Sequence, residues 1–216
     1  LIDLDNLKKS IDSMRTKDRK TIESIEKVAK EKSFFHWEIE FPEVFFERVG
    51  ALEQKVERKE NPGFDCVIGN PPYGTLKERV YFKETFPATS QTLDAYSAFM
   101  EHNHVLLKVQ GLNSFIVPVS WQTGTLYESL RSLLLENYNF KQIVNLPFDV
   151  FEDAYIDTII FVFEKSTFPI NKTNSVLVYE FPKNAKVESL DKIDYSAIDQ
   201  CIWQINRKQI ILDADA

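Results

Sequence analysis

The sequence predicts an α/β fold in which strands and helices alternate along an open sheet, with a helical segment in front of it. Apolar runs rich in β-branched residues have the length of buried strands at 64–69, 111–118, 140–146 and 157–163. Two amphipathic stretches, 92–111 and 125–137, separate the first three runs. No helical stretch separates the last two runs.

The part of the chain before the first strand is predicted to be mainly helical. Residues 1–33 lack glycine, and their apolar residues recur at steps of three and four, which predicts one or two amphipathic helices. At 34–45 a dense aromatic segment predicts a loop with a short strand, whose rings we expect in the core. Residues 47–63 are charged and end in Asn-Pro-Gly, a turn signal that leads into the strand.

A rigid turn follows the first strand. Gly-Asn-Pro-Pro-Tyr at 69–73 stops the apolar run 64–69, which we predict to be a buried strand of a parallel sheet. Each proline fixes its own φ, removes an N–H group and restrains the preceding residue. Asn70 and Tyr73 are therefore expected on a stiff loop at the carboxyl end of a strand, where open α/β sheets bind ligands.

Two helices are expected beyond this loop. The first has Thr92 as its N-cap and ends at Gly111. Its expected apolar face comprises Tyr96, Phe99, Met100, Leu106 and Leu107. The second helix is expected to bury Leu126, Leu130, Leu133 and Leu134. Residues 74–91, before both, predict a solvated loop or phosphate contacts, because they carry the cations Lys77, Arg79 and Lys83.

The end of the chain is less regular. Phe-Asp-Val-Phe-Glu-Asp-Ala at 148–154 lies between the last two of the four predicted strands. A further strand is predicted at 176–181, and a short helix within the polar stretch 184–200.

Composition narrows the functional classes. No apolar run is long enough to span a membrane and no signal peptide opens the chain, so we expect a cytoplasmic protein without a membrane partner. The two cysteines, Cys66 and Cys201, lie far apart and predict no metal site. The net charge of -7 argues against a DNA-binding surface made by this chain alone.

Three stretches together resemble a known enzyme family. Asn-Pro-Pro-Tyr at 70–73 after an apolar strand resembles the catalytic motif of N6-adenine DNA methyltransferases that use S-adenosylmethionine (AdoMet). Asp-Ala-Tyr-Ser-Ala-Phe at 94–99 resembles the start of their next helix, and 148–154 resembles their late motif. The resemblance covers roughly residues 34–165, in the gamma-type order of large type IIG and type I-like restriction-modification enzymes. It implies the C-terminal half of a Rossmann-like class I methyltransferase sheet, whose last two strands form an antiparallel hairpin.

The resemblance implies roles for five residues. Asn70, Pro71 and Tyr73 would be catalytic, whereas Pro72 and Phe151 would bind the substrate base. The adenine N6 amine is a weak nucleophile because its lone pair is delocalised into the ring. The Asn70 side-chain oxygen and the Pro71 carbonyl are suited to accept both N6 protons and return the lone pair to nitrogen. The base must first leave the duplex, and stacking on Tyr73 and Phe151 would offset part of that cost.

The cofactor site is incomplete in this sequence. An AdoMet site needs a glycine-rich loop, but none of the six glycines forms a Gly-x-Gly cluster. The main AdoMet motif is therefore expected upstream, and within the chain only Trp37 and Phe41 are candidates for cofactor contact. We expect a fragment of a catalytic domain that is inactive alone and whose exposed sheet edge favours self-association.

The expected organisation has three parts: a helical segment at 1–33, the C-terminal half of the catalytic domain at 34–183, and a connector towards a target-recognition domain at 184–216. The expected function is methyl transfer from AdoMet to a flipped adenine in DNA, within a larger restriction-modification or phage-defence enzyme. Two alternatives stay open. A related enzyme could methylate RNA or a protein glutamine, and the acidic charge favours a noncatalytic interaction module that retains the fold.

Overall fold

The computed structural model describes residues 16–32, 35–50, 55–77, 79–148, 150–151, 156–167, 174–205 and 210. The chain forms two compact units, residues 1–42 and 43–216. No helix within the described ranges is both long and apolar enough to cross a membrane.

The described residues of the first unit are mainly helical. Its main element is α2 (Thr16–Lys32), which matches the predicted amphipathic helix, while residues 1–15 lie outside the described ones. The aromatic segment forms the short helices α3 (Trp37–Glu40) and α4 (Pro42–Phe45) instead of the expected strand. Its rings were expected in the core, and Phe45 is buried as expected, but Phe35 is 55% exposed. Phe35 lies before α3, in a segment without regular structure.

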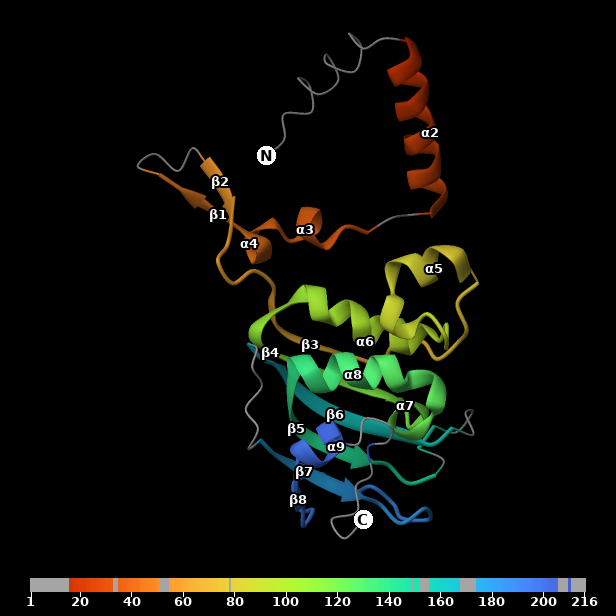
Figure 1. Cartoon of the computed structure of the whole chain (residues 1–216), viewed down its shortest axis with the longest axis vertical. Coiled ribbons are helices and arrows are strands. Elements are labelled where there is room, and N and C mark those ends of the chain that lie inside the picture. The colour runs from red at the N-terminus through yellow and green to blue at the C-terminus, as the bar shows by residue number, and fades with distance from the viewer. Residues whose placement is uncertain are drawn as a thin grey trace. The chain divides into compact units, whose positions relative to one another are not determined.

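The second unit is built on a six-stranded mixed sheet in the order β3-β4-β6-β5-β7-β8 (Figure 1). The strands are β3 (Phe64–Gly69), β4 (Leu107–Pro118), β5 (Tyr138–Asn145), β6 (Thr158–Lys165), β7 (Ser175–Glu180) and β8 (Ser196–Asp199). β3 runs parallel to β4 and β5 to β7, whereas β6 lies antiparallel between β4 and β5. The predicted α/β fold and its hairpin are confirmed. A separate antiparallel pair, β1 (Phe46–Val49) and β2 (Lys55–Arg58), precedes the sheet.

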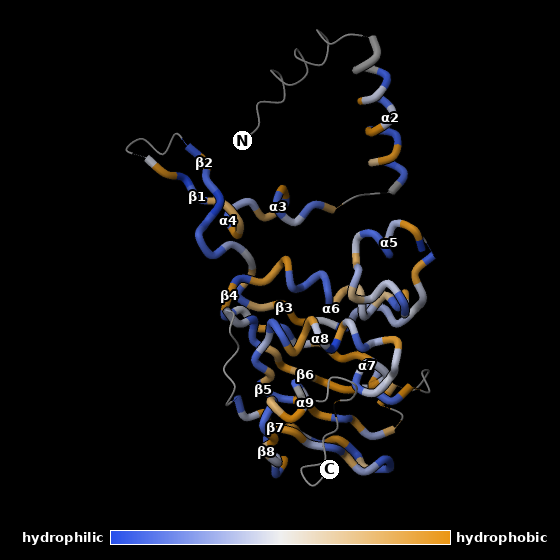
Figure 2. The backbone as a smooth tube through the Cα atoms, in the orientation of Figure 1, coloured by the Kyte–Doolittle hydropathy of each residue, from blue (hydrophilic) through white to orange (hydrophobic). Residues whose placement is uncertain are grey.

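Helices cover one face of this sheet. The helical elements are α5 (Arg79–Thr85), η1 (Pro87–Thr89), α6 (Ala95–Leu106), α7 (Ser120–Thr123), η2 (Thr125–Tyr127), α8 (Glu128–Asn137) and α9 (Cys201–Ile205). α6 and α8 lie over the sheet in Figure 1, and Figure 2 shows the hydrophobic residues concentrated along the strands. Beneath them, the Phe163 ring stacks between Phe140 and Phe161, with centroid distances of 3.8 and 4.1 Å. These rings form the centre of the core.

The prediction that β3 is buried is wrong. Ile68 is 79% exposed, and only Val67 of the strand's central residues packs against the core. β3 lies at the edge of the sheet, where β4 is the one strand that pairs with it among the described residues. An apolar run has the same composition at an edge as in the centre of a sheet, so composition alone could not distinguish the two positions.

The ends of α6 differ from the prediction. The N-cap is Asp94 and not Thr92, and the helix ends at Leu106 and not at Gly111, because the chain passes directly into β4 at Leu107. Lys165 replaces the expected glycine cap, since its Nζ donates to the carbonyls of His104 and Leu107 at 2.6 and 2.7 Å. These carbonyls belong to the last turn of α6 and the residue that follows it.

Two expected core residues are exposed. Phe99 on α6 is 46% exposed and Leu126 at the start of the second predicted helix is 53% exposed, whereas Tyr96, Leu130 and Leu134 are buried as expected. The buried face of each of the two predicted helices is therefore narrower than its number of apolar residues suggests.

Removing the Lys165 cap tests its contribution to the fold. Lys165→Met keeps the aliphatic stem but leaves two helix-terminal carbonyls without their charged donor, so we expect a loss of about 1.5–3 kcal/mol in the free energy of unfolding. Urea titration measures the loss. The matched control is Lys141→Met, which removes a partly exposed ion pair with Glu164 and should cost at most about 1 kcal/mol. Equal midpoints for the two variants would contradict the cap.

The last segment packs on the sheet. No helix forms in 184–200; instead β8 pairs with β7, and α9 follows it. Ile198, Trp203 and Ile210 are buried in the core. The described part of 184–216 therefore completes the sheet, and its further role as a connector stays a prediction.

Candidate functional site

The motif loop, residues 70–73, begins where β3 ends at Gly69. Asn70 and Pro72 are exposed, Pro71 is buried and Tyr73 is half-buried. The Asn70 side chain thus remains accessible, while the chain beside it is held in the fold. This is the position at the carboxyl end of a strand that the prolines predicted.

Two contacts fix the orientation of the Tyr73 ring. Its hydroxyl donates a hydrogen bond to the Ile116 carbonyl of β4 at 3.1 Å. Its ring meets that of Tyr96 edge-on, with a centroid distance of 6.3 Å and an interplanar angle of 84°. Burial raises the pKa of Tyr73, so the hydroxyl stays protonated at neutral pH and keeps donating.

The structure places Phe151 beside Tyr73. Their ring centroids are 6.5 Å apart at an interplanar angle of 75°. Phe151 is half-buried and follows β5, whereas Tyr73 follows β3. The two aromatic residues named for base contact are therefore brought together from distant parts of the sequence, while residues 149 and 152–154 of the late motif lie outside the described residues.

Backbone pairing holds the exit of the motif loop. The carbonyl of Gly74 accepts from the N–H of Ala95 at 2.9 Å, and the N–H of Leu76 donates to the Leu93 carbonyl at 2.8 Å. Thr75 and Asp94 form an antiparallel bridge between them. Residues 77–92 are thus an excursion whose two ends meet directly after the motif loop.

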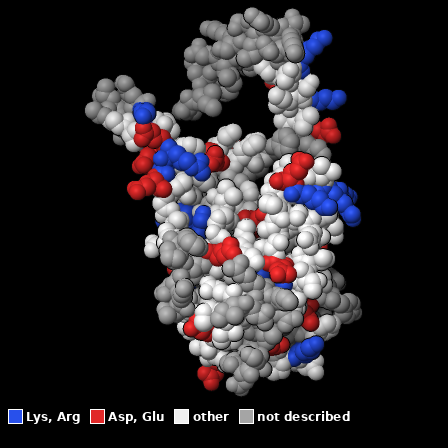
Figure 3. Space-filling view, in the orientation of Figure 1, with Lys and Arg blue, Asp and Glu red and all other residues white. Residues whose placement is uncertain are grey.

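The predicted cations lie on this excursion. Lys77, Arg79 and Lys83 are all exposed, at or near α5. Figure 3 shows Lys and Arg side chains over α5 next to acidic ones. The site is therefore bordered by mixed charge and not by a uniformly basic surface.

The cofactor candidates lie in the other compact unit. Trp37 and Phe41 are each 36% exposed, and their rings stack with a centroid distance of 6.0 Å at 22°. Their role stays a prediction. Within the described ranges, no group of three or more His, Cys, Asp or Glu residues could hold a metal ion.

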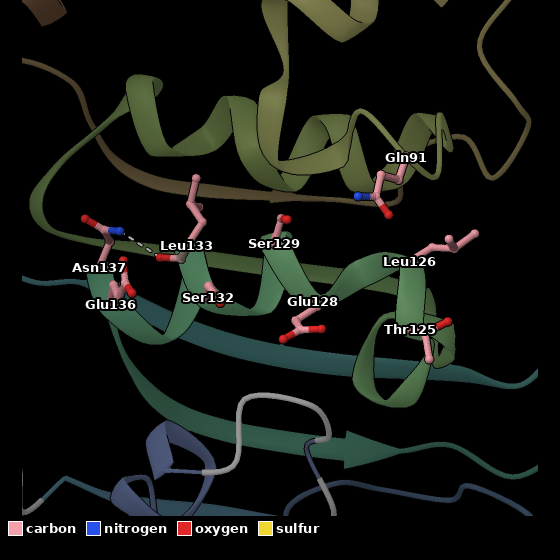
Figure 4. Close-up of a pocket in the computed structure, with 9 residues that line it drawn as sticks. All are labelled: Gln91, Thr125, Leu126, Glu128, Ser129, Ser132, Leu133, Glu136 and Asn137. Carbon is pink, nitrogen blue, oxygen red and sulfur yellow. Dashed lines mark hydrogen bonds between the residues drawn. The ribbon is translucent and has the colours of Figure 1, made fainter.

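A groove elsewhere does not include the motif loop. It has a volume of about 490 Å³ and runs along the outer side of α8, opposite Gln91 (Figure 4). Its lining residues are Gln91, Thr125, Leu126, Glu128, Ser129, Ser132, Leu133, Glu136 and Asn137. It holds none of the residues predicted for catalysis, so we assign it no part in the site.

The sequence did not predict a contact next to the site, between Asp94 and Tyr127. Asp94 begins the 94–99 stretch that resembles the start of the family's next helix, and its Oδ2 accepts a hydrogen bond from the Tyr127 hydroxyl. The Tyr127 ring also stacks on Tyr96, with centroids 6.1 Å apart at 27°. No local pattern signals this pair, because the two residues are 33 positions apart.

Comparison with known proteins finds one matching family. The model of the Eco57I restriction-modification methylase matches residues 2–151. A similar protein is a putative type II restriction enzyme and methyltransferase of Methanocaldococcus jannaschii, which is 34% identical over 198 residues, or 89% of this chain and 15% of the relative. An adenine-specific methyltransferase, BrxX of Escherichia coli, is 37% identical over 90 residues, or 38% of this chain and 7% of the relative.

The fold is similar to part of a solved restriction-modification enzyme. This is a nuclease-deletion mutant of the type ISP enzyme LlaGI in complex with a DNA substrate mimic, with a TM-score of 0.50 at 16% identity. The match covers 63% of this chain and 14% of that one. This chain thus spans a small share of the length of the relatives that it matches.

Proposed function

The chain belongs to the Eco57I restriction-modification methylase family. On this premise we propose that its motif loop supplies the residues for methyl transfer to the N6 amine of a flipped adenine in DNA. We infer that it does so as part of a longer restriction-modification or phage-defence enzyme. Asn70, Pro71 and Tyr73 would be the catalytic residues, and Pro72 and Phe151 would contact the base.

The acceptor side of the reaction suits these residues. An amine lone pair that is delocalised into adenine becomes nucleophilic when two acceptors draw the N6 protons out of the ring plane. The exposed Asn70 carboxamide provides one acceptor and the Pro71 carbonyl the other. A neutral amide avoids the desolvation cost of a carboxylate. The N6–C bond would form as the bond between the methyl group and the donor sulfur breaks, and the electron pair of the broken bond would stay on sulfur, which becomes a neutral thioether. The extra N6 proton would then be acidic and leave to solvent.

The methyl donor would be AdoMet, which supplies an electrophilic methyl group on its sulfonium. The chain has no Gly-x-Gly cluster that could hold the methionine part, so we place the main cofactor motif upstream of it. The residues of the motif loop fit the methyl acceptor, and we assign them no direct cofactor contact.

One observation carries the proposal: the Tyr73 and Phe151 rings meet beside an accessible Asn70 at the end of a strand. Aromatic rings that meet edge-on expose a face and an edge to a third ring. A flipped purine next to Asn70 would contact both, and stacking is worth about 1–3 kcal/mol per base. This arrangement supports base contact more directly than a core role, because neither ring is buried.

The acceptor class is tested by transfer of a labelled methyl group. The intact protein that carries this chain is incubated with labelled AdoMet and with duplex DNA, RNA or protein in separate reactions. We expect label only in DNA, on N6-methyladenine. Label in RNA or on a protein glutamine would show that DNA is not the substrate. AdoMet binding without any methyl transfer would favour a noncatalytic interaction module.

Tyr73 can be tested separately from the methyl transfer step. Tyr73→Ala should weaken binding of the flipped base by about 1–3 kcal/mol, because the stacking ring is lost. Tyr73→Phe keeps the ring and loses only the hydroxyl bond to Ile116, so we expect a smaller effect. The emission of 2-aminopurine at the target position reports the flipped base. An Ala variant with wild-type emission would contradict the stacking role.

A further inference from the structure

We propose that Asp94 and Tyr127 are positioning residues, which together hold Tyr73 in the orientation that stacks on the base. This inference rests on the proposed function and extends it to two residues outside the motif loop. Neither is argued to touch the substrate. The pair acts through two structural routes, which both lead to Tyr73.

The first route is the backbone after the motif loop. Asp94 lies between Leu93 and Ala95, which bind Leu76 and Gly74. Leu93 has a φ of 56°, a left-handed conformation that costs a non-glycine residue about 1–2 kcal/mol per residue. Such strain persists only where the surroundings fix it. The hydrogen bond from Tyr127 to the side chain of the next residue, Asp94, is a contact that can hold this conformation.

The second route is a series of rings. The Tyr127 ring stacks on Tyr96 at 6.1 Å, and Tyr96 meets Tyr73 edge-on at 6.3 Å. Tyr96 is 2% exposed, so it has little freedom to turn. A shift of Tyr127 would therefore reach Tyr73 through a close-packed neighbour.

The Asp94 carboxylate accepts a hydrogen bond from Tyr127 and does not cap its own helix. Asp94 occupies the N-cap of α6, where such a side chain commonly bonds the first turn, yet it makes no capping hydrogen bond. It accepts from the Tyr127 hydroxyl instead. Burial and this carboxylate raise the pKa of Tyr127 to about 12, so the hydroxyl remains a donor throughout the neutral range.

Tyr127 itself is mounted on a rigid turn. Buried Arg131 donates through Nη1 to the carbonyls of Trp121 and Gly124, each at 2.7 Å. A Cβ at Gly124 would lie 2.7 Å from the Ser120 carbonyl oxygen and 2.8 Å from the Tyr127 ring, so only glycine fits this close turn. The donor to Asp94 is therefore fixed in place independently of the motif loop.

The test uses the intact protein with Tyr127→Phe, Asp94→Ala and the double variant. We expect each single variant to lower kcat by roughly tenfold and to reduce the 2-aminopurine signal, while the Kd for AdoMet stays unchanged. The double variant should be no worse than the singles, since both remove the same hydrogen bond. Asp94→Asn keeps an acceptor oxygen and should restore most of the activity. The control Tyr195→Phe removes a tyrosine hydroxyl that accepts from Gln142 far from the motif loop and should leave kcat unchanged.

The outcomes separate the two proposals. Wild-type kcat and emission in both Tyr127→Phe and Asp94→Ala would refute the positioning role while the methyltransferase proposal stands. A parallel loss of AdoMet binding and of Tm would also refute it, since the pair would then support the fold in general. If wild-type protein transfers no methyl group to DNA, the proposed function fails and the positioning role fails with it.

Discussion

In the Asn70→Ala variant, methyl transfer is expected to fall by about 10²–10³-fold, while the affinity for AdoMet stays nearly unchanged. The reason is that the lost carboxamide oxygen is one of two acceptors proposed for the N6 protons. Because Asn70 is exposed, its truncation should leave Tm within a few degrees of wild type. Single-turnover methylation of labelled DNA measures the rate of the chemical step directly.

Asn70→Asp is the informative companion. It keeps an acceptor oxygen at the same position but adds a charge that must be desolvated when the base enters. We therefore expect a rate between those of the wild type and of Asn70→Ala. Retained wild-type turnover in Asn70→Ala would remove Asn70 from the mechanism, and a rate for Asn70→Asp as low as that for Ala would show that an acceptor alone is insufficient.

The elements that the sequence predicted well are those determined by local pattern. The strands at 111–118, 140–146 and 157–163 follow from apolar runs without helical spacing, and they form as β4, β5 and β6. The position of the motif loop follows from its prolines, which restrict the backbone whatever surrounds them. Local chemistry was sufficient in these places.

Long-range contacts account for what the sequence could not predict. Lys165, which lies 61 positions after His104, binds the carbonyl of His104 at the end of α6. No local signal near residue 106 predicts this partner. In the same way, Asp94 is a residue type that commonly caps helices and stands at the N-cap of α6, but its side chain accepts a hydrogen bond from the buried Tyr127 instead. A residue type limits the bonds that a side chain can make, but the fold chooses among them.

The second large effect is expected at Gly63, where the chain enters β3. Its φ is +127°, and a Cβ there would lie 2.4 Å from the Lys108 backbone nitrogen and 2.6 Å from the Leu106 carbonyl oxygen. These atoms belong to the junction at which α6 becomes β4. Backbone atoms cannot rotate away as a side chain does, so Gly63→Ala must separate the start of β3 from β4.

We expect Gly63→Ala to lower the free energy of unfolding by about 4 kcal/mol, the sum of backbone strain and overpacking. Gly50→Ala is the matched control, because Gly50 also has a positive φ, of +96°, but a Cβ there would meet nothing within 4 Å. Its loss should therefore reflect strain alone, at about 1–3 kcal/mol. Urea titration of both variants isolates the clash as the difference. Equal urea midpoints for the two variants would contradict the clash. The backbone at the junction of α6 and β4 would then move to accommodate the added methyl group.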